Sequence, residues 1–206
     1  MMRIEVPIFF LAVGSVFCQD PSNKPFMPKP PAPGPCPTVP VVQQFNLRKY
    51  LGRWYEIERF FNPFQDGDCV TADYALLPNG SVSVANSEFT EGELNTIFGL
   101  ATLGPKEYEG RLVVEFPFTE GGSRGSSDGK PNYNVVATDY YNYAVVYSCS
   151  SLGPNLKFEF SWILARRPSV PTHFLVTLRK WLKKVNVDAS RYIPTIQGPD
   201  CVRRQI

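Results

Sequence analysis

The stretch Lys49–Phe64, KYLGRWYEIERFFNPF, decides the fold, and it follows directly on a proline-rich segment. From Trp54 to Phe60, bulky and acidic residues alternate, which is typical of a β-strand with one buried face. Alternation with a period of two places Glu56 and Glu58 on the same face as Trp54. Because buried carboxylates are unfavourable unless they are paired or hydrated, this strand needs a polar partner or water near its end.

The chain beyond this strand repeats the same pattern of short strands and turns. Eight strands are predicted, over residues 54–60, 69–77, 81–89, 96–103, 111–116, 132–140, 143–149 and 156–166. Their links have the length of hairpins, except for the glycine- and serine-rich loop over residues 119–131. No link is long enough for a helical crossover, so neighbouring strands are expected to be antiparallel. The predicted fold class is all-β.

The last predicted strand shows the clearest alternation. One face carries Phe158, Phe160, Trp162 and Leu164, and the other carries Lys157, Glu159 and Ser161. Such a strand separates an apolar interior from water. Eight strands of this kind can close into an up-and-down barrel, which removes exposed sheet edges. A barrel of eight strands either fills with its own side chains or holds one small ligand.

Residues 172–185 predict an amphipathic α-helix, because apolar residues recur there at helical spacing opposite a basic face. A membrane-surface helix is one interpretation. We favour a helix packed on the outside of the barrel with its cations in solvent, because a barrel wall of this size has to be covered.

The two ends of the chain suggest a secreted protein with a tethered arm. Residues 1–18 resemble a signal peptide, although an uncleaved anchor is the alternative. Residues 19–40 form a proline-rich arm, and residues 41–206 form the globular domain, with a barrel over 52–167 and a C-terminal tail over 186–206. Asn79 begins the single glycosylation sequon, in a turn context.

Cleavage after Cys18 leaves four cysteines, an even number in an oxidising compartment. Two disulfides are therefore expected, and spacing alone allows three pairings. The formal net charge of +2 and the lack of a long basic stripe argue against nucleic-acid binding. With a single histidine, His173, and no closely spaced cysteines, neither a metal site nor a catalytic pair is expected, so the chain is not predicted to be an enzyme.

Three short motifs, in order around the eight strands, resemble those of the lipocalin family. The residues are Gly52 and Trp54 on the first strand, Thr138, Asp139 and Tyr140 near the sixth, and Arg166 after the eighth. Within that family, YLGRWYEIER, ATDYYNYAVVYSC and WILARRP are similar to apolipoprotein D-like, lazarillo-type and bilin-binding invertebrate lipocalins. The resemblance implies that the tryptophan closes one end of the barrel and that the arginine lies across it. These motif residues are accordingly read as structural.

The resemblance also implies a disulfide framework and a ligand site. The pairs would be Cys36 with Cys149 and Cys69 with Cys201. Residues that the resemblance or the alternation places at the open end are Tyr74, Asn86, Trp162, Phe158 and Phe160. Glu58 would meet water or a polar ligand group there. In the following loop, Phe60, Phe61 and Phe64 would form an apolar lid, or else pack within the loop itself.

A lipocalin of this kind is expected to carry a small hydrophobic ligand such as a lipid, a sterol, a retinoid or a pigment. No cofactor is required, although biliverdin or a carotenoid could be the bound chromophore. The alternative is a pigment protein that acts in coloration by assembling with partners. An exposed aromatic lid could also contact membranes or lipoprotein particles. The expected state is a monomer or a weak homodimer.

Overall fold

The computed structural model describes residues 31–116, 124–125, 129–198 and 201. The predicted signal peptide, most of the proline-rich arm and most of the glycine- and serine-rich loop lie outside the described residues. The elements are β1 (Ala32–Pro33), α1 (Leu47–Tyr50), β2 (Gly52–Phe60), β3 (Asp68–Leu76), β4 (Val82–Thr90), β5 (Glu93–Leu103), β6 (Arg111–Phe116), β7 (Arg124–Gly125), β8 (Tyr133–Thr138), β9 (Tyr143–Leu152), β10 (Leu156–Ala165), α2 (Thr172–Lys184), the 3-10 helix η1 (Ala189–Arg191) and β11 (Tyr192–Pro194).

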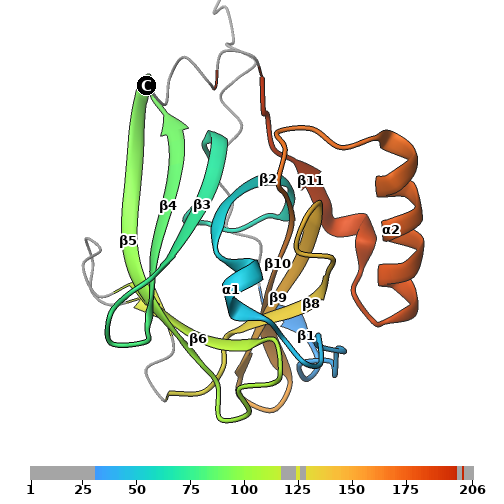
Figure 1. Ribbon diagram of the computed structural model, residues 1–206. Coiled ribbons are helices and arrows are strands. Elements are labelled where there is room, and N and C mark those ends of the chain that lie inside the picture. The colour runs from blue at the N-terminus through green and yellow to red at the C-terminus, as the bar shows by residue number, and fades with distance from the viewer. Residues whose placement is uncertain (1–30, 117–123, 126–128, 199–200, 202–206) are drawn as a thin grey trace, which may run out of the picture.

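Eight of these strands form a closed antiparallel barrel, as predicted (Figure 1). The wall runs in the order β2, β3, β4, β5, β6, β8, β9 and β10, and pairing of β10 with β2 closes it. Every registered pairing is antiparallel. All eight barrel strands overlap the segments that alternation predicts, because each has one apolar face to bury.

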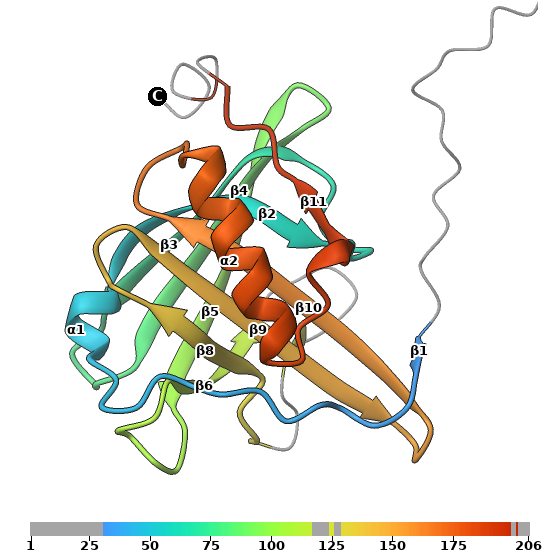
Figure 2. The same ribbon diagram turned by 90° about the vertical axis from the view of Figure 1, so that its right-hand side faces the viewer.

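Helix α2 packs against the outside of the barrel, which confirms the favoured interpretation (Figure 2). Leu178 and Leu182 on its apolar side are 5% and 0% exposed. They belong to a core cluster that is separate from the one inside the barrel. That cluster also contains Val145 and Ile163, from the outer faces of β9 and β10. Within the described part of the chain, no helix is both long enough and apolar enough to cross a bilayer.

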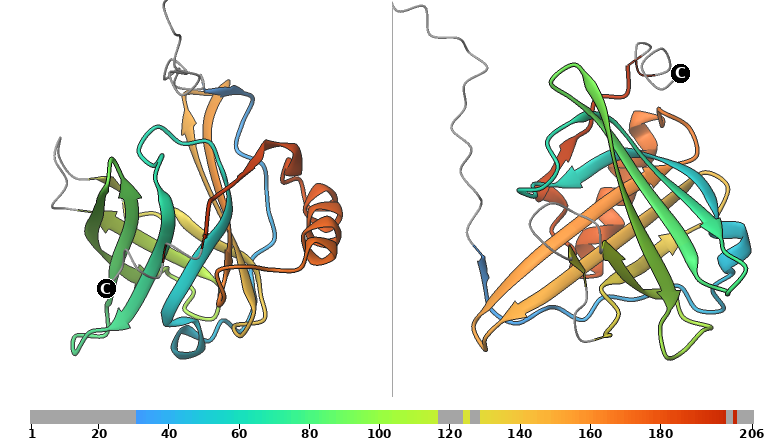
Figure 3. Two further views of the ribbon diagram at one scale, coloured as in Figure 1. Left: turned by 90° about the horizontal axis from the view of Figure 1, so that it is seen from above. Right: turned by 90° about the vertical axis from the view of Figure 1, so that its left-hand side faces the viewer.

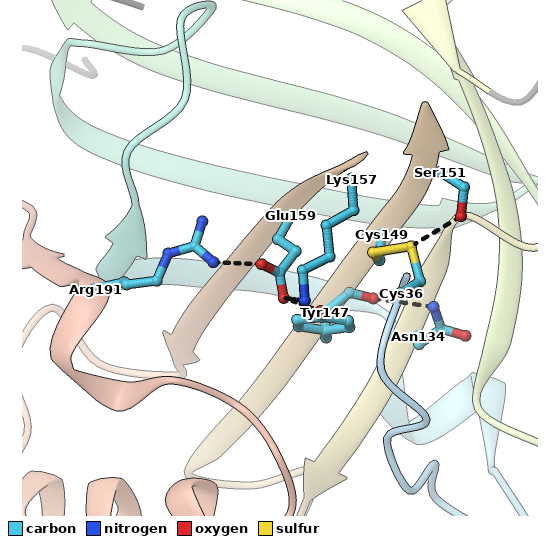
Figure 4. Close-up of a disulfide and its surroundings, with 8 residues drawn as sticks. All are labelled: Cys36, Asn134, Tyr147, Cys149, Ser151, Lys157, Glu159 and Arg191. Carbon is cyan, nitrogen blue, oxygen red and sulfur yellow. Dashed lines mark hydrogen bonds and ion pairs between the residues drawn. A yellow bond between two sulfur atoms is a disulfide. The ribbon is translucent and has the colours of Figure 1, made fainter. Parts of the chain in front are cut away.

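The outer face of β10 differs from its prediction, because the C-terminal segment covers it instead of water. Ser161 is fully buried, and its hydroxyl lies 2.6 Å from that of Tyr192. Glu159 accepts hydrogen bonds from Tyr147, at 2.5 Å, and from Arg191, at 2.6 Å (Figure 4). Burial alone would raise the pKa of Glu159, but these hydrogen bonds lower it below its ordinary value. The tail is thus fastened to the barrel wall.

Candidate functional site

One end of the barrel is closed by Trp54, which is completely buried. Its indole Nε1 donates to the carbonyl oxygen of Tyr50 at 2.8 Å, at the end of the short helix α1. The chain then turns into β2 at Gly52, whose φ of +90° is a backbone conformation that favours glycine. The guanidinium carbon of Arg166 lies 3.6 Å from the centre of the Trp54 ring, a cation–π geometry.

Arg166 also supplies the hydrogen-bond donors that the end of α1 lacks. Its Nη2 donates to the carbonyl oxygens of Lys49, Tyr50 and Leu51, at 2.9, 3.2 and 2.9 Å. The last carbonyls of a helix have no partner within the helix, so these bonds satisfy them. Stacking and hydrogen bonding together account for the arginine in the third motif.

The turn that contains Thr138, Asp139 and Tyr140 fixes the other side of Arg166. Asp139 accepts hydrogen bonds from three successive backbone N–H groups, those of residues 141–143. Tyr140 adopts a φ of +68°, and its carbonyl oxygen accepts from Nε of Arg166 at 3.1 Å. The turn therefore aims a carbonyl at the guanidinium, which is a structural role for the second motif.

Beside Trp54, whose ring lies 5.2 Å from that of Tyr50, three tyrosine hydroxyls meet inside the barrel, and we call them the tyrosine triad. The hydroxyl of Tyr133 lies 2.8 Å from that of Tyr50 and 3.0 Å from that of Tyr74. The three side chains come from β8, α1 and β3 and are packed with the barrel core. Tyr50 and Tyr74 are 1% and 9% exposed, whereas Tyr133 retains intermediate exposure.

At the opposite, open end, an irregularity in β2 changes which side chains face inward. Leu164 of β10 pairs with Glu56, but the next residue, Ile163, pairs with Glu58, so Ile57 is an extra residue on the β2 side. Such a β-bulge reverses the alternation of the residues that follow it. Glu56 therefore faces the interior with Trp54, whereas Glu58 faces outward.

The predictions for Glu58 and Phe60 are wrong for this reason. Glu58 accepts two hydrogen bonds from Arg179 on the outer helix α2, at 2.6 and 3.2 Å, so this arginine is not free in solvent either. Phe60 is 1% exposed and packs edge-on against Tyr192 of the C-terminal segment, with ring centres 4.7 Å apart. Neither side chain faces the barrel interior.

Phe64, in the loop after β2, does lie at the open end. Its ring packs edge-on against that of Phe160, with centres 5.2 Å apart, and it is 43% exposed. Phe160 stacks in turn on Trp162, with centres 6.2 Å apart. Phe158, two residues before Phe160 on the same face of β10, is 38% exposed. These aromatic side chains form one edge of the opening.

The interior near the opening contains a polar network that we call the mouth network. Its members are Glu56, Arg59, Gln65 and Thr195. Arg59 donates to Glu56 at 3.2 Å, and Gln65 donates to the other carboxylate oxygen at 2.6 Å. Burial raises the pKa of Glu56, although its hydrogen bonds with Thr195, Arg59 and Gln65 act in the opposite direction. The indole Nε1 of Trp162 donates a hydrogen bond to the side-chain oxygen of Gln65 at 3.3 Å. This bond links the mouth network to the aromatic edge of the opening.

Thr195 reaches the mouth network because the C-terminal segment fills a gap in the barrel wall. Strands β2 and β3 pair only over residues 52–55 and 71–74. Beyond that point β11 pairs with β2, and the side chain of Gln197 donates to the carbonyl oxygens of both Glu56 and Val70. The disulfide between Cys69 and Cys201 holds this segment in place. We call the arrangement the C-terminal seam, and Figure 3 shows the segment running beside β2.

The two ends of the barrel differ in how completely the inward side chains are buried. Around the closed end, Val82 and Val84 are 2% and 1% exposed. Toward the opening, Asn86 and Trp162 face the same interior but keep intermediate exposure. The Oδ1 atom of Asn86 is buried and has no hydrogen-bond partner within the described part of the chain.

The second disulfide joins the proline-rich arm to the barrel, through Cys36 and Cys149 (Figure 4). Both pairings are those that the family resemblance implies. Asn79 lies exposed in the turn between β3 and β4, where its side chain accepts from the backbone N–H of Ser81 at 3.1 Å. Its glycosylation stays a prediction.

Sequence reasoning missed five members of the site, and Arg59 is among them because uniform alternation places it on the outer face. Alternation could have found Tyr133, which shares a strand face with the buried Val135. Tyr50 lies only four residues before Trp54, but it belongs to a helical turn that the pattern did not indicate. Gln65 and Thr195 lie in irregular segments, and no periodic signal marks them.

The chain is similar in sequence to a known domain family and to several known proteins. The model of the Lipocalin-like domain matches residues 45–197. Apolipoprotein D of Cavia porcellus is 39% identical over 80% of this chain and 84% of its own. Apolipoprotein D of Mus musculus is 36% identical over 80% and 84%. The Lazarillo protein of Schistocerca americana is 32% identical over 79% and 75%.

Two solved structures show the same arrangement of strands. Insecticyanin from the tobacco hornworm Manduca sexta superposes with a TM-score of 0.70 at 26% identity, over 82% of this chain and 90% of its own. Lobster apocrustacyanin A1 superposes with a TM-score of 0.67 over 85% and 95%, and at 23% identity this likeness concerns the fold alone.

Proposed function

Because the chain belongs to the lipocalin family, we propose that it is a secreted carrier that holds one small hydrophobic molecule in the open half of its barrel. The observation that carries the proposal is the contrast in burial along the interior. Inward side chains at the closed end are nearly inaccessible, whereas Asn86, Tyr133 and Trp162 keep part of their surface exposed. Partial exposure of side chains that point into a barrel is what an internal ligand space produces.

The chemistry of these side chains suits an apolar ligand with few polar atoms. Trp162, Phe160 and Phe64 offer aromatic surface in contact with one another. On β4, the Oδ1 of Asn86 has no partner in the described part of the chain and offers one polar atom to the same interior. Sites for small molecules combine mostly apolar walls with a small number of placed polar groups.

Binding, and not catalysis, is the activity that the reactive groups support. All four cysteines that the structure describes are in disulfides, so none of them supplies a thiolate. His173 is exposed on the outer helix α2, away from the barrel interior. The chain is therefore proposed to deliver its ligand unchanged.

A binding panel tests this proposal. Purified protein is titrated with a fatty acid, a sterol, a retinoid and biliverdin, and the quenching of tryptophan fluorescence is followed. At least one ligand is expected to bind in the micromolar range or tighter, about −8 kcal/mol. Visible absorbance of the biliverdin complex also tests the pigment-carrier alternative.

Two tryptophan variants locate the bound ligand. Trp162→Leu removes an interior contact and should weaken binding about tenfold, whereas Trp181→Leu, on the outer helix, should leave the dissociation constant unchanged. The proposal is abandoned if no panel member binds, or if the two variants weaken binding equally.

A further inference from the structure

The tyrosine triad has one more hydrogen-bond donor than its own contacts use. Three phenol hydroxyls carry three protons, and the two contacts, of Tyr133 with Tyr50 and with Tyr74, use two of them. No other residue in the described ranges accepts a hydrogen bond from these hydroxyls. One O–H group therefore remains available for a hydrogen bond.

The contacts of the three hydroxyls and the exposure of their side chains favour Tyr133 as the residue that carries the available proton. A buried donor without a partner is destabilising, so the proton is least favourable on Tyr50 or Tyr74, which are almost fully buried. Tyr133 keeps intermediate exposure. Its oxygen has two lone pairs, so it can accept from both neighbours while its own O–H points away from them. This assignment pairs the donors of Tyr50 and Tyr74, and it leaves only the Tyr133 O–H without an acceptor in the described part of the chain.

The charge state of the triad defines the acceptor that suits it. Burial raises the pKa of Tyr50 and Tyr133 well above the ordinary tyrosine value, and raises that of Tyr74 to about 12. All three phenols are thus neutral donors at physiological pH. The nearby Arg166 already donates to five backbone carbonyl contacts around the plug, so its N–H groups are engaged there. Within the described part of the chain, a ligand anion at the triad would find no free N–H group of Arg166 to pair with.

We propose that Tyr133 donates a hydrogen bond to an uncharged oxygen, a ketone or a hydroxyl, at the inner end of the carried ligand. The inference rests on the proposed function, and it narrows the ligand class to hydrophobic molecules with a neutral terminal oxygen. A site that offers a buried polar group discriminates against analogues that lack the matching group, because the group is then left unpaired.

A pair of fluorescent probes tests the inference on the full-length protein. Prodan is an uncharged naphthyl ketone whose emission moves to longer wavelength when its carbonyl accepts a hydrogen bond. Its propyl analogue has a methylene group in place of the carbonyl and is otherwise the same molecule. Wild-type protein is expected to bind the ketone about tenfold more tightly than the propyl analogue.

Three variants separate the donor from its neighbours. Tyr133→Phe should abolish the preference for the ketone and shift the emission of bound Prodan to shorter wavelength. Tyr74→Phe disturbs the same cluster but leaves the Tyr133 donor, so the preference should persist. Tyr108→Phe, at an exposed position, is the matched control for the loss of a phenol hydroxyl.

The outcomes distinguish the inference from the proposed function. If both probes bind the wild type equally well, the inference is overturned while the carrier function stands. If neither probe binds, and no member of the ligand panel binds, both are overturned. If Tyr133→Phe does not fold, the wild-type ratio of the two affinities and the emission wavelength of bound Prodan still decide the question.

Discussion

The two ends of the barrel are built from the same strands by different means. At the closed end, a tryptophan, an arginine and a tight turn meet through regular strand geometry, and the interior is close to solvent-free. At the open end, a β-bulge and an inserted C-terminal segment interrupt that regularity, and they place a polar network inside the barrel. The closed end thus serves stability. At the irregular end, the bulge turns the side chains that follow it from one face of β2 to the other.

The largest effect is expected at the closed end, from Trp54→Ala. Removing a fully buried indole should lower the free energy of unfolding by about 3–5 kcal/mol, because a cavity replaces it beneath Arg166. Urea denaturation followed by circular dichroism measures the change. Trp181→Ala, on the half-buried side of α2, is the control and should have a smaller effect. A loss below about 1 kcal/mol for Trp54→Ala would show that the plug is not a stabilising core.

The two disulfides sharpen the comparison because they close loops of similar length, 113 and 132 residues apart. Loop entropy alone predicts nearly equal losses, about 2–5 kcal/mol each, when a pair is changed to serine. Loss of the Cys69–Cys201 pair should in addition release the C-terminal seam.

Hydrogen exchange separates these two effects. Amides of β2 and β3 near the opening should exchange faster in the Cys69→Ser, Cys201→Ser variant than in the Cys36→Ser, Cys149→Ser variant. Identical exchange maps for the two double variants would mean that the seam does not depend on its disulfide.

An intermediate effect is expected where α2 meets the bulged strand. Arg179→Met leaves the carboxylate of Glu58 buried without its partner and should reduce stability by about 1–3 kcal/mol. Lys180→Met removes the same charge from the exposed face and should be nearly neutral. Ligand affinity should not change in either variant, because Glu58 faces outward. If Arg179→Met weakened ligand binding and Lys180→Met did not, this would contradict the claim that the β-bulge turns Glu58 to the outer face.

The smallest effect concerns Asp139 in the turn beside Arg166. Partial burial acts to raise its pKa, but hydrogen bonds from Asn142, Tyr143 and Tyr141 lower it below the ordinary value. A carboxylate with a lowered pKa contributes stability that is present above the ordinary pKa and is lost as pH falls through the lowered one. Stability of the wild type minus that of Asp139→Asn should therefore be greatest near neutral pH and vanish in acid. If this difference in stability stayed constant with pH, the charge of the Asp139 carboxylate would not be what stabilises the turn.

The closed end was largely predictable from the sequence, and the open end was not. The positions of Trp54 and Arg166 follow from motifs, and the strands follow from alternation, because both are local patterns. Alternation assumes a uniform pleat, so it placed Glu58 inward when the extra residue Ile57 turns it outward. The C-terminal seam leaves no periodic signal, since its strand is only three residues long.

The tyrosine triad was hidden for another reason. Its members lie at positions 50, 74 and 133, so only closure of the barrel brings their hydroxyls together. Sequence patterns report which face a side chain belongs to, and they do not report which side chains from distant strands meet at one depth.

The chain has three tryptophans, and each one reports on a different place: Trp54 in the plug, Trp162 inside the open half and Trp181 on the outer helix. A ¹⁵N correlation spectrum of their indole N–H groups, recorded during titration with a bound hydrophobic ligand, tests the central claim directly. The account predicts a large shift of the Trp162 signal, a small shift for Trp54 and none for Trp181. A shift of the Trp181 signal with Trp162 unchanged would place the ligand outside the barrel and contradict it.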